Sequence, residues 1–203
     1  MRLARYAVMG CALAFAGSAQ AFGIGVRAGT TGVGADVAWS FAPTLSARLG
    51  YSTLRWDHDT DTDNVRYDGK LKLNNFNALV DFSPLGPFRL TGGVIFNDNK
   101  YDVRGESNGG AIVGSVKSGR SAAPYLGIGY GNVSGAGINF YADLGIMFMG
   151  SPRANLTAEC GSLGASACAD LRSRAASEQG RLEDELKRFK HYPVLNLGLT
   201  VGF

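Results

Sequence analysis

The chain ends on Leu195-Asn196-Leu197-Gly198-Leu199-Thr200-Val201-Gly202-Phe203, in which apolar residues alternate with small or polar ones up to a final aromatic residue. Side chains of a β-strand point alternately to its two faces. The five apolar residues therefore share one face, and the small and polar residues share the other. The pattern predicts a last strand with one face for an apolar environment and one that tolerates water.

The other end of the chain has the pattern of a signal peptide. Arg2 and Arg5 precede an apolar run from 6 to 17, and Ala19-Gln20-Ala21 forms a small-x-small cleavage site. We expect residues 1–21 to be removed and the mature chain to begin at Phe22. The apolar run is too short for a membrane-spanning helix, which needs about 20 residues, and no later segment reaches that length. If this chain lies in a membrane, it crosses as strands.

Composition argues for one all-β domain over residues 22–203. Two of the 20 Lys and Arg lie in the signal peptide, which leaves 18 against 17 acidic residues. A nucleic-acid partner has no electrostatic support at this charge balance. Glycine accounts for 29 of the 203 residues, and no Pro- or Ser-rich linker divides the chain.

Alternation recurs along the mature chain and predicts eight strands: 22–31, 33–41, 45–53, 67–82, 88–103, 122–131, 138–150 and 192–203. The segments between them are expected to be connections, including a polar stretch at 55–66, a Gly/Ser-rich loop at 104–121 and a long loop at 151–191. In the fourth strand the apolar residues change parity, and a bulge near Asn74-Asn75 would reconcile the two halves.

Short and long connections alternate along the chain. Short turns at one end and long loops at the other are typical of a membrane barrel with periplasmic turns and external loops. A soluble lipocalin-like barrel would show the same period with its faces exchanged. The polar parity is mostly Gly, Ser and Asn, which suits the crowded inside of an eight-stranded barrel. We therefore expect an eight-stranded antiparallel transmembrane β-barrel with a short helix in its last external loop. It would be a monomer in the outer membrane of a Gram-negative bacterium, in contact with lipid and lipopolysaccharide.

Several segments, in order, are similar to the small outer-membrane barrels of the CarO type, which are linked to uptake of ornithine and other basic amino acids. They are 26–34 (VRAGTTGVG), 49–51 (LGY), 67–69 (YDG), 97–102 (NDNKYD), 124–129 (PYLGIG), 150–153 (GSPR) with 156–157 (LT), and 192–194 (YPV). The resemblance implies a barrel with a narrow path for small polar solutes. The likeness of the last strand to that of outer-membrane barrels in general implies that the terminal aromatic residue, Phe203, is the signal read by the barrel assembly machinery. This chain departs from the family in ending on Phe203 and in the cysteine pair and charged helical segment of its last loop.

Charged residues lie on the parity expected to face the lumen: Arg27, Asp36, Arg48, Arg89 and Asp143, with Asp81 joining them depending on the bulge. Buried charges are costly unless paired, so one interpretation is an internal salt-bridge network that closes the barrel. The other is a polar path for a charged or zwitterionic solute. Asn97 and Asn99 are expected near the outer mouth of this path.

The loop at 151–191 holds two further features. Cys160 and Cys168 are expected to form a disulfide, as in other exported proteins. Between 167 and 190 the apolar period approaches 3.6, which predicts a helix interrupted at Gly180. The helix could lie across the barrel mouth as a lid or pack on its own rim.

Metal, cofactor and enzyme chemistry have weak support. Aspartates alternate from Asp57 to Asp63, but the stretch lacks the Gly and the bidentate Glu of a calcium loop. The two histidines are His58 and His191, and nothing fixes an acid beside either. The leading hypothesis is a narrow channel for small polar solutes such as basic amino acids. The alternatives are a non-conducting structural or adhesion barrel and, third, a lipid-modifying enzyme that uses His191.

Overall fold

The computed structural model describes residues 21–62, 65–107 and 109–203, so the predicted signal peptide lies almost wholly outside the described residues. Eight strands pair antiparallel in a closed ring in which the first strand meets the last. In ring order they are β1 (Phe22–Gly29), β2 (Gly32–Ala42), β3 (Leu45–Thr62), β4 (Val65–Leu85), β5 (Phe88–Asn97), β8 (Ala122–Gly131), β9 (Gly137–Met147) and β11 (Tyr192–Gly202). The predicted barrel is confirmed. No helix in the described ranges is long and apolar enough to cross a membrane.

The two faces of the ring differ as the alternation predicts. On β11, Leu197 and Val201 are exposed on the outside, whereas Asn196 and Thr200 are buried in the interior. The same division holds around the ring, where the exposed large side chains are apolar and the buried ones are largely polar or charged. An outer face of this kind is stable against lipid, and an interior of this kind is not the apolar core of a soluble barrel.

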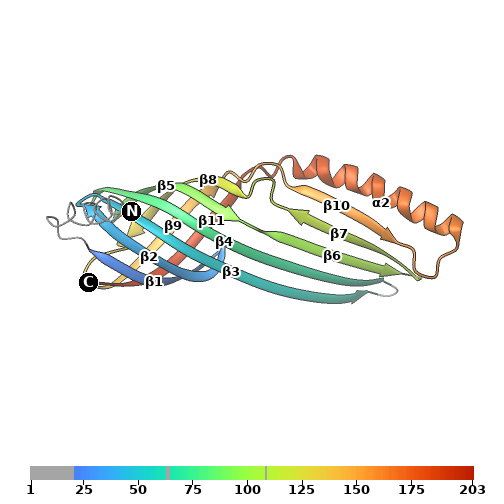
Figure 1. The fold of residues 1–203 in the computed structure, drawn as a ribbon, viewed down its shortest axis with the longest axis horizontal. Helices are drawn as coiled ribbons and strands as arrows, with labels where there is room; N and C mark the ends of the chain where they lie inside the picture. Colours follow the sequence, from blue (N-terminus) through green and yellow to red (C-terminus); the bar gives the residue numbers. More distant parts are fainter. Residues whose placement is uncertain (1–20, 63–64, 108) are drawn as a thin grey trace, which may run out of the picture.

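Phe22 and Phe203 close the ring at its seam. Each backbone amide donates to the other residue's carbonyl at 3.0 Å, and the two aromatic rings lie 5.4 Å apart between centroids. The carboxyl terminus lies at the end of the barrel with the short turns (Figure 1). Phe203 therefore holds the first and last strands together at that end.

We expect Phe203→Ala to reduce the amount of assembled protein in the membrane severalfold. The substitution removes the ring contact across the seam, which is worth about 0.5–1.5 kcal/mol, and the predicted assembly signal. Heat-modifiable migration of membrane fractions on a gel measures the assembled fraction. Phe189→Ala is the matched control, because Phe189 is an exposed phenylalanine after the helix. Equal assembled amounts of the two variants would contradict a role for Phe203.

Beyond the barrel, β3 and β4 continue into an external sheet. It is completed by β6 (Lys100–Ser107), β7 (Gly110–Lys117) and β10 (Arg153–Glu159), in the order β3-β4-β6-β7-β10. We call these five strands with the helix that follows the extension, which projects from the end of the barrel opposite the carboxyl terminus (Figure 1). Short turns face the periplasm in membrane barrels, so we expect the extension to lie on the outer side.

The prediction that 55–66 and 104–121 are connections was wrong, because β3 and β4 run through the first segment and β7 lies in the second. The predicted helix in the loop at 151–191 is confirmed as α2 (Ala165–Leu186), but this loop also holds the strand β10. The glycines of β7 predict a loop, but in the structure they leave room for packing. A Cβ at Gly114 would lie 2.7 Å from the Leu156 side chain and 2.9 Å from that of Val103. A glycine within a strand often marks such a close approach.

The predicted bulge at Asn74-Asn75 is also wrong, because β3 and β4 keep one register from Leu45↔Phe82 to Thr62↔Val65. The apolar residues change parity for another reason. Within the barrel they face outward, and in the extension Trp56 and Leu71 lie on the face continuous with the lumen. At the same place β4 changes partner from β5 to β6. The change of parity marks where the strand leaves the barrel.

The helix α2 (Ala165–Leu186) runs lengthwise beside β10 rather than across the barrel mouth (Figure 1). Gln179 accepts a hydrogen bond from the Leu156 amide at 3.1 Å, so the helix satisfies the edge of the sheet. The prediction that Gly180 interrupts the helix was wrong, since α2 continues through it. The predicted disulfide between Cys160 and Cys168 is present and ties the end of β10 to the first turns of α2.

Candidate functional site in the barrel lumen

Three arginines and three aspartates meet inside the barrel, each from a different strand. They are Arg27 on β1, Asp36 on β2, Arg48 on β3, Asp81 on β4, Arg89 on β5 and Asp143 on β9. None is more than 4% exposed. We call these six residues the lumen network. All the charged residues predicted to face the lumen do so, and Asp81 joins them because β4 has no bulge at Asn74-Asn75.

Asp143 is the centre of the lumen network. One carboxylate oxygen accepts from Arg48 Nη1 at 2.6 Å and the other from Arg89 Nη2 at 2.5 Å. Arg48 also donates to Asp81 through Nη2 at 3.2 Å. Asp81 accepts a further hydrogen bond from Thr91 at 2.6 Å. Two arginines thus share two aspartates, and the charges balance where solvent does not reach.

Tyr141 joins this centre to the second part of the lumen network. Its hydroxyl donates to Asp36, which lies 3.4 Å from Arg27. The guanidinium groups of Arg48 and Arg89 lie 5.0 and 5.3 Å from the centre of its ring. Contacts of this kind are attractive, and more so when desolvated. Sequence reasoning placed Tyr141 on the lumen parity but did not single it out, although a large aromatic residue among small polar ones was an available signal.

Glycines facing the lumen network leave space for it. A Cβ at Gly129 would lie 2.6 Å from Arg89 Nη2 and 2.7 Å from Asp143 Oδ1. A Cβ at Gly50 would overlap the carboxylate of Asp36, and one at Gly198 would overlap the ring of Tyr141. The glycine content of these strands thus has a steric cause, because large polar side chains fill a narrow barrel.

Toward the outer end, the lumen is filled partly by an apolar cluster formed by Leu79, Ile95, Ala123, Tyr125, Met147 and Val194. Asn97 and Asn99 lie at the rim, as predicted, where β5 passes into β6. Asn97 donates to the Arg120 carbonyl at 2.9 Å, and Asn99 donates to Asn75 Oδ1 at 3.1 Å and accepts from the Asn74 amide. These contacts hold the strand junction in place. A role for either residue in solute passage stays a prediction.

At the end of the barrel with the short turns, a cavity of about 400 Å³ opens between the turns and reaches inward to Arg89. Its lining is polar and includes Ser40, Ser46, Asn132 and Ser134. This opening stops at the lumen network, whose members are buried. From this end, the interior is thus open to solvent only as far as Arg89.

The residues considered for enzyme and metal chemistry lie outside the lumen network. The ring of His191 packs edge-on against Phe148 at 5.3 Å between centroids. Asp57 and Asp59 lie on β3, an extended strand, and not in a calcium-binding loop. Among the described residues, no three His, Cys, Asp or Glu gather as a metal site would require.

A closed antiparallel ring of eight strands, with an apolar outer face and an interior filled by side chains, defines a small transmembrane β-barrel. No protein-family model matches this chain, and no curated protein matches it in sequence. Solved structures do match its fold. Acinetobacter baumannii CarO aligns with a TM-score of 0.63 and 19% identity over 89% of this chain and 97% of CarO. CarO2 from the same organism aligns with a TM-score of 0.61 and 20% identity over 90% of this chain and 98% of CarO2.

The resemblance predicted from the sequence is therefore confirmed for the fold. The likeness extends over nearly the whole length of both proteins. It supports an outer-membrane barrel.

Proposed function

We propose that this chain is an outer-membrane barrel whose lumen is closed at rest and which acts through its external extension. One observation carries the proposal: Arg48, Asp81 and Asp143 are at most 3% exposed and are joined by ion pairs across the lumen at mid-height. A path for solute through this level would require breaking these contacts in a region of low dielectric. The extension, by contrast, presents a wide external surface.

Conductance of the folded protein tests the closed lumen. Purified protein with heat-modifiable migration is inserted in planar bilayers and measured in potassium chloride and then with ornithine, arginine and glutamate. We expect no unitary conductance and no flux of the three amino acids. A porin of wider bore in the same bilayers shows that a conducting barrel would be detected. Steady single-channel conductance of the folded protein would overturn the proposal.

The second candidate is the narrow channel for small polar solutes, with basic amino acids as the case that the resemblance implies. Asn77 favours it, because this residue is 1% exposed and neither of its side-chain amide atoms has a partner among the described residues. Buried polar groups of this kind ordinarily bind water or a polar ligand. Uptake of ornithine or arginine that falls in Asn77→Leu, with the barrel still folded, would favour the channel.

A further inference from the structure

Five basic residues form a continuous row across the external sheet. The strand register places Arg55 opposite Lys72, Lys72 opposite Lys100, Lys100 opposite Lys117, and Lys117 opposite Arg153. We call these residues the basic row. Each lies on the face of the external sheet that is continuous with the outer, lipid-facing surface of the barrel. The row spans β3, β4, β6, β7 and β10, and every strand of the extension contributes one cation.

Such an arrangement is unfavourable by itself. Like charges directly opposite one another on neighbouring strands are destabilising. Lys100 is paired with Asp102 at 2.7 Å, whereas no ion pair neutralises the other four members among the described residues. The next cross-strand row farther from the barrel contains both acidic and basic residues, namely Asp57, Lys70 and Asp102. The repulsion within the basic row is relieved if anions bind along it.

The height of the basic row indicates which anions these are. Tyr51, Phe76 and Phe96 lie opposite one another and point outward at the upper end of the barrel. Aromatic rows of this kind mark the interface between hydrocarbon and headgroups. Arg55 is four residues beyond Tyr51 on β3, and Lys72 is four beyond Phe76 on β4, a distance of about 13 Å along the strand. The basic row thus lies at the level of the lipid headgroups.

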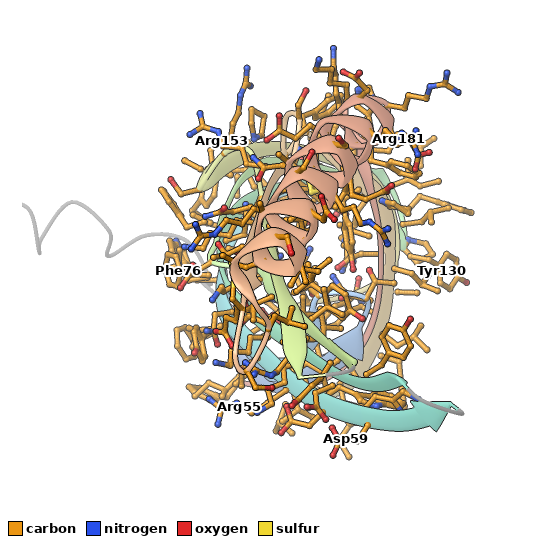
Figure 2. All side chains as sticks on the ribbon, turned by 90° about the vertical axis from the view of Figure 1, so that its right-hand side faces the viewer. Arg55, Asp59, Phe76, Tyr130, Arg153 and Arg181 are labelled. Carbon is orange, nitrogen blue, oxygen red and sulfur yellow. A yellow bond between two sulfur atoms is a disulfide. The ribbon has the colours of Figure 1, made fainter. Side chains whose placement is uncertain are left out.

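Figure 2 shows the two ends of the basic row on the same side of the molecule as Phe76. Arg55 and Arg153, the two ends of the row, and Phe76 all lie on the left of the view, with Phe76 between them. Lipid that contacts Phe76 would therefore place its headgroup beside the basic row.

A cationic groove continues the row past Arg153. A cavity of about 610 Å³ is lined by Arg120, Arg153, Lys187 and Lys190, with Glu183 as its acidic member. A smaller cavity of about 270 Å³ beside it is lined by Lys117 and Arg153. Asp184 bonds Lys187 at 2.7 Å, and this hydrogen bond raises the pKa of Lys187, so the amine stays charged. Arginine and lysine in such a groove donate charge-assisted hydrogen bonds to phosphate oxygens.

We propose that the basic row and this groove bind the phosphate groups of lipopolysaccharide in the outer leaflet and hold the extension against the membrane. The inference rests on the outer-membrane location in the proposed function, but not on whether the lumen conducts. Phosphate is the group recognised. Because the basic row faces outward and lies at the level of the headgroups, we assign the site to the phosphate of a lipid rather than to a free anion.

The test measures binding of fluorescent diphosphorylated lipid A to detergent-purified protein with EDTA present, so that no divalent ion bridges the two. The variant is K72Q/K100Q/K117Q, and the matched control is R172Q/R174Q/R181Q, which removes three exposed cations from α2. A cation near an anionic headgroup contributes about 1 kcal/mol, so we expect the variant to bind at least tenfold more weakly. The lipid A affinity of the control should stay within about twofold of that of the wild type, because cations away from the headgroups do not contribute this energy. Heat-modifiable migration verifies that both variants are folded.

Two further arms identify the source of the phosphate. Dephosphorylated lipid A should bind weakly to wild type and variant alike, and inorganic phosphate at the same phosphate concentration should not displace the lipid. Equal binding by the variant and the control would overturn the proposal, as would displacement by inorganic phosphate. If the folded protein conducts in bilayers while the row variant still binds lipid A more weakly than the control, only the proposed closed lumen is overturned.

Discussion

Asp143→Ala is expected to lower the free energy of unfolding by about 3–5 kcal/mol. The carboxylate of Asp143 is the shared partner of Arg48 and Arg89, and all three side chains are buried. Its removal leaves two guanidinium groups competing for Asp81 in a region where a charge cannot be hydrated. Unfolding in urea, followed by the loss of heat-modifiable migration, gives the change.

Two variants test whether unpaired charge is the cause. Asp170→Ala removes an exposed aspartate of α2 and should change the stability by less than about 0.5 kcal/mol. Adding Arg48→Met to Asp143→Ala removes the arginine left without its partner and should recover part of the loss, because an ion pair replaced by apolar groups is often neutral. If Asp143→Ala is no less stable than Asp170→Ala, the lumen network does not stabilise the barrel.

Gly198→Val is the second substitution expected to have a large effect. Its Cβ would overlap the ring of Tyr141, which is 4% exposed. The ring cannot move away without losing its hydrogen bond to Asp36 and its position beside Arg48. Overpacking of this kind costs about 1–3 kcal/mol and occasionally more, and loss of the buried hydrogen bond adds to it. The same urea unfolding measures the change.

Gly180→Val is the matched control for this substitution. Gly180 is an exposed residue within α2, and nothing lies within 4 Å of a Cβ added there. Its stability should stay within about 0.5 kcal/mol of the wild type, because Val is slightly more favourable than Gly in a helix. A Gly198→Val barrel as stable as the Gly180→Val barrel would show that the lumen has room to spare, and this would support a solute path instead of a closed interior.

The external sheet shows where sequence reasoning reached its limit. Residues 110–117 alternate, but Gly110 and Gly114 made the segment resemble a loop. Whether a glycine marks a turn or a tight contact depends on which side chains approach it, here Leu163 at Gly110 and Leu156 at Gly114. Those partners are far along the chain, so no local pattern identifies them. The apparent bulge in β4 failed for a related reason, because a change of surroundings along one regular strand looks the same in sequence as an extra residue.

The sequence by itself determined the eight barrel strands, the outward apolar face and the set of charged residues in the lumen. These follow from period-two alternation, which is a local property of a strand. Only the tertiary structure decided which charges pair. Asp143 meets Arg48 and Arg89, which are 95 and 54 residues away, because ring closure and register bring β3, β5 and β9 to one height. The basic row has the same origin, since register alone places one cation from each of five strands side by side.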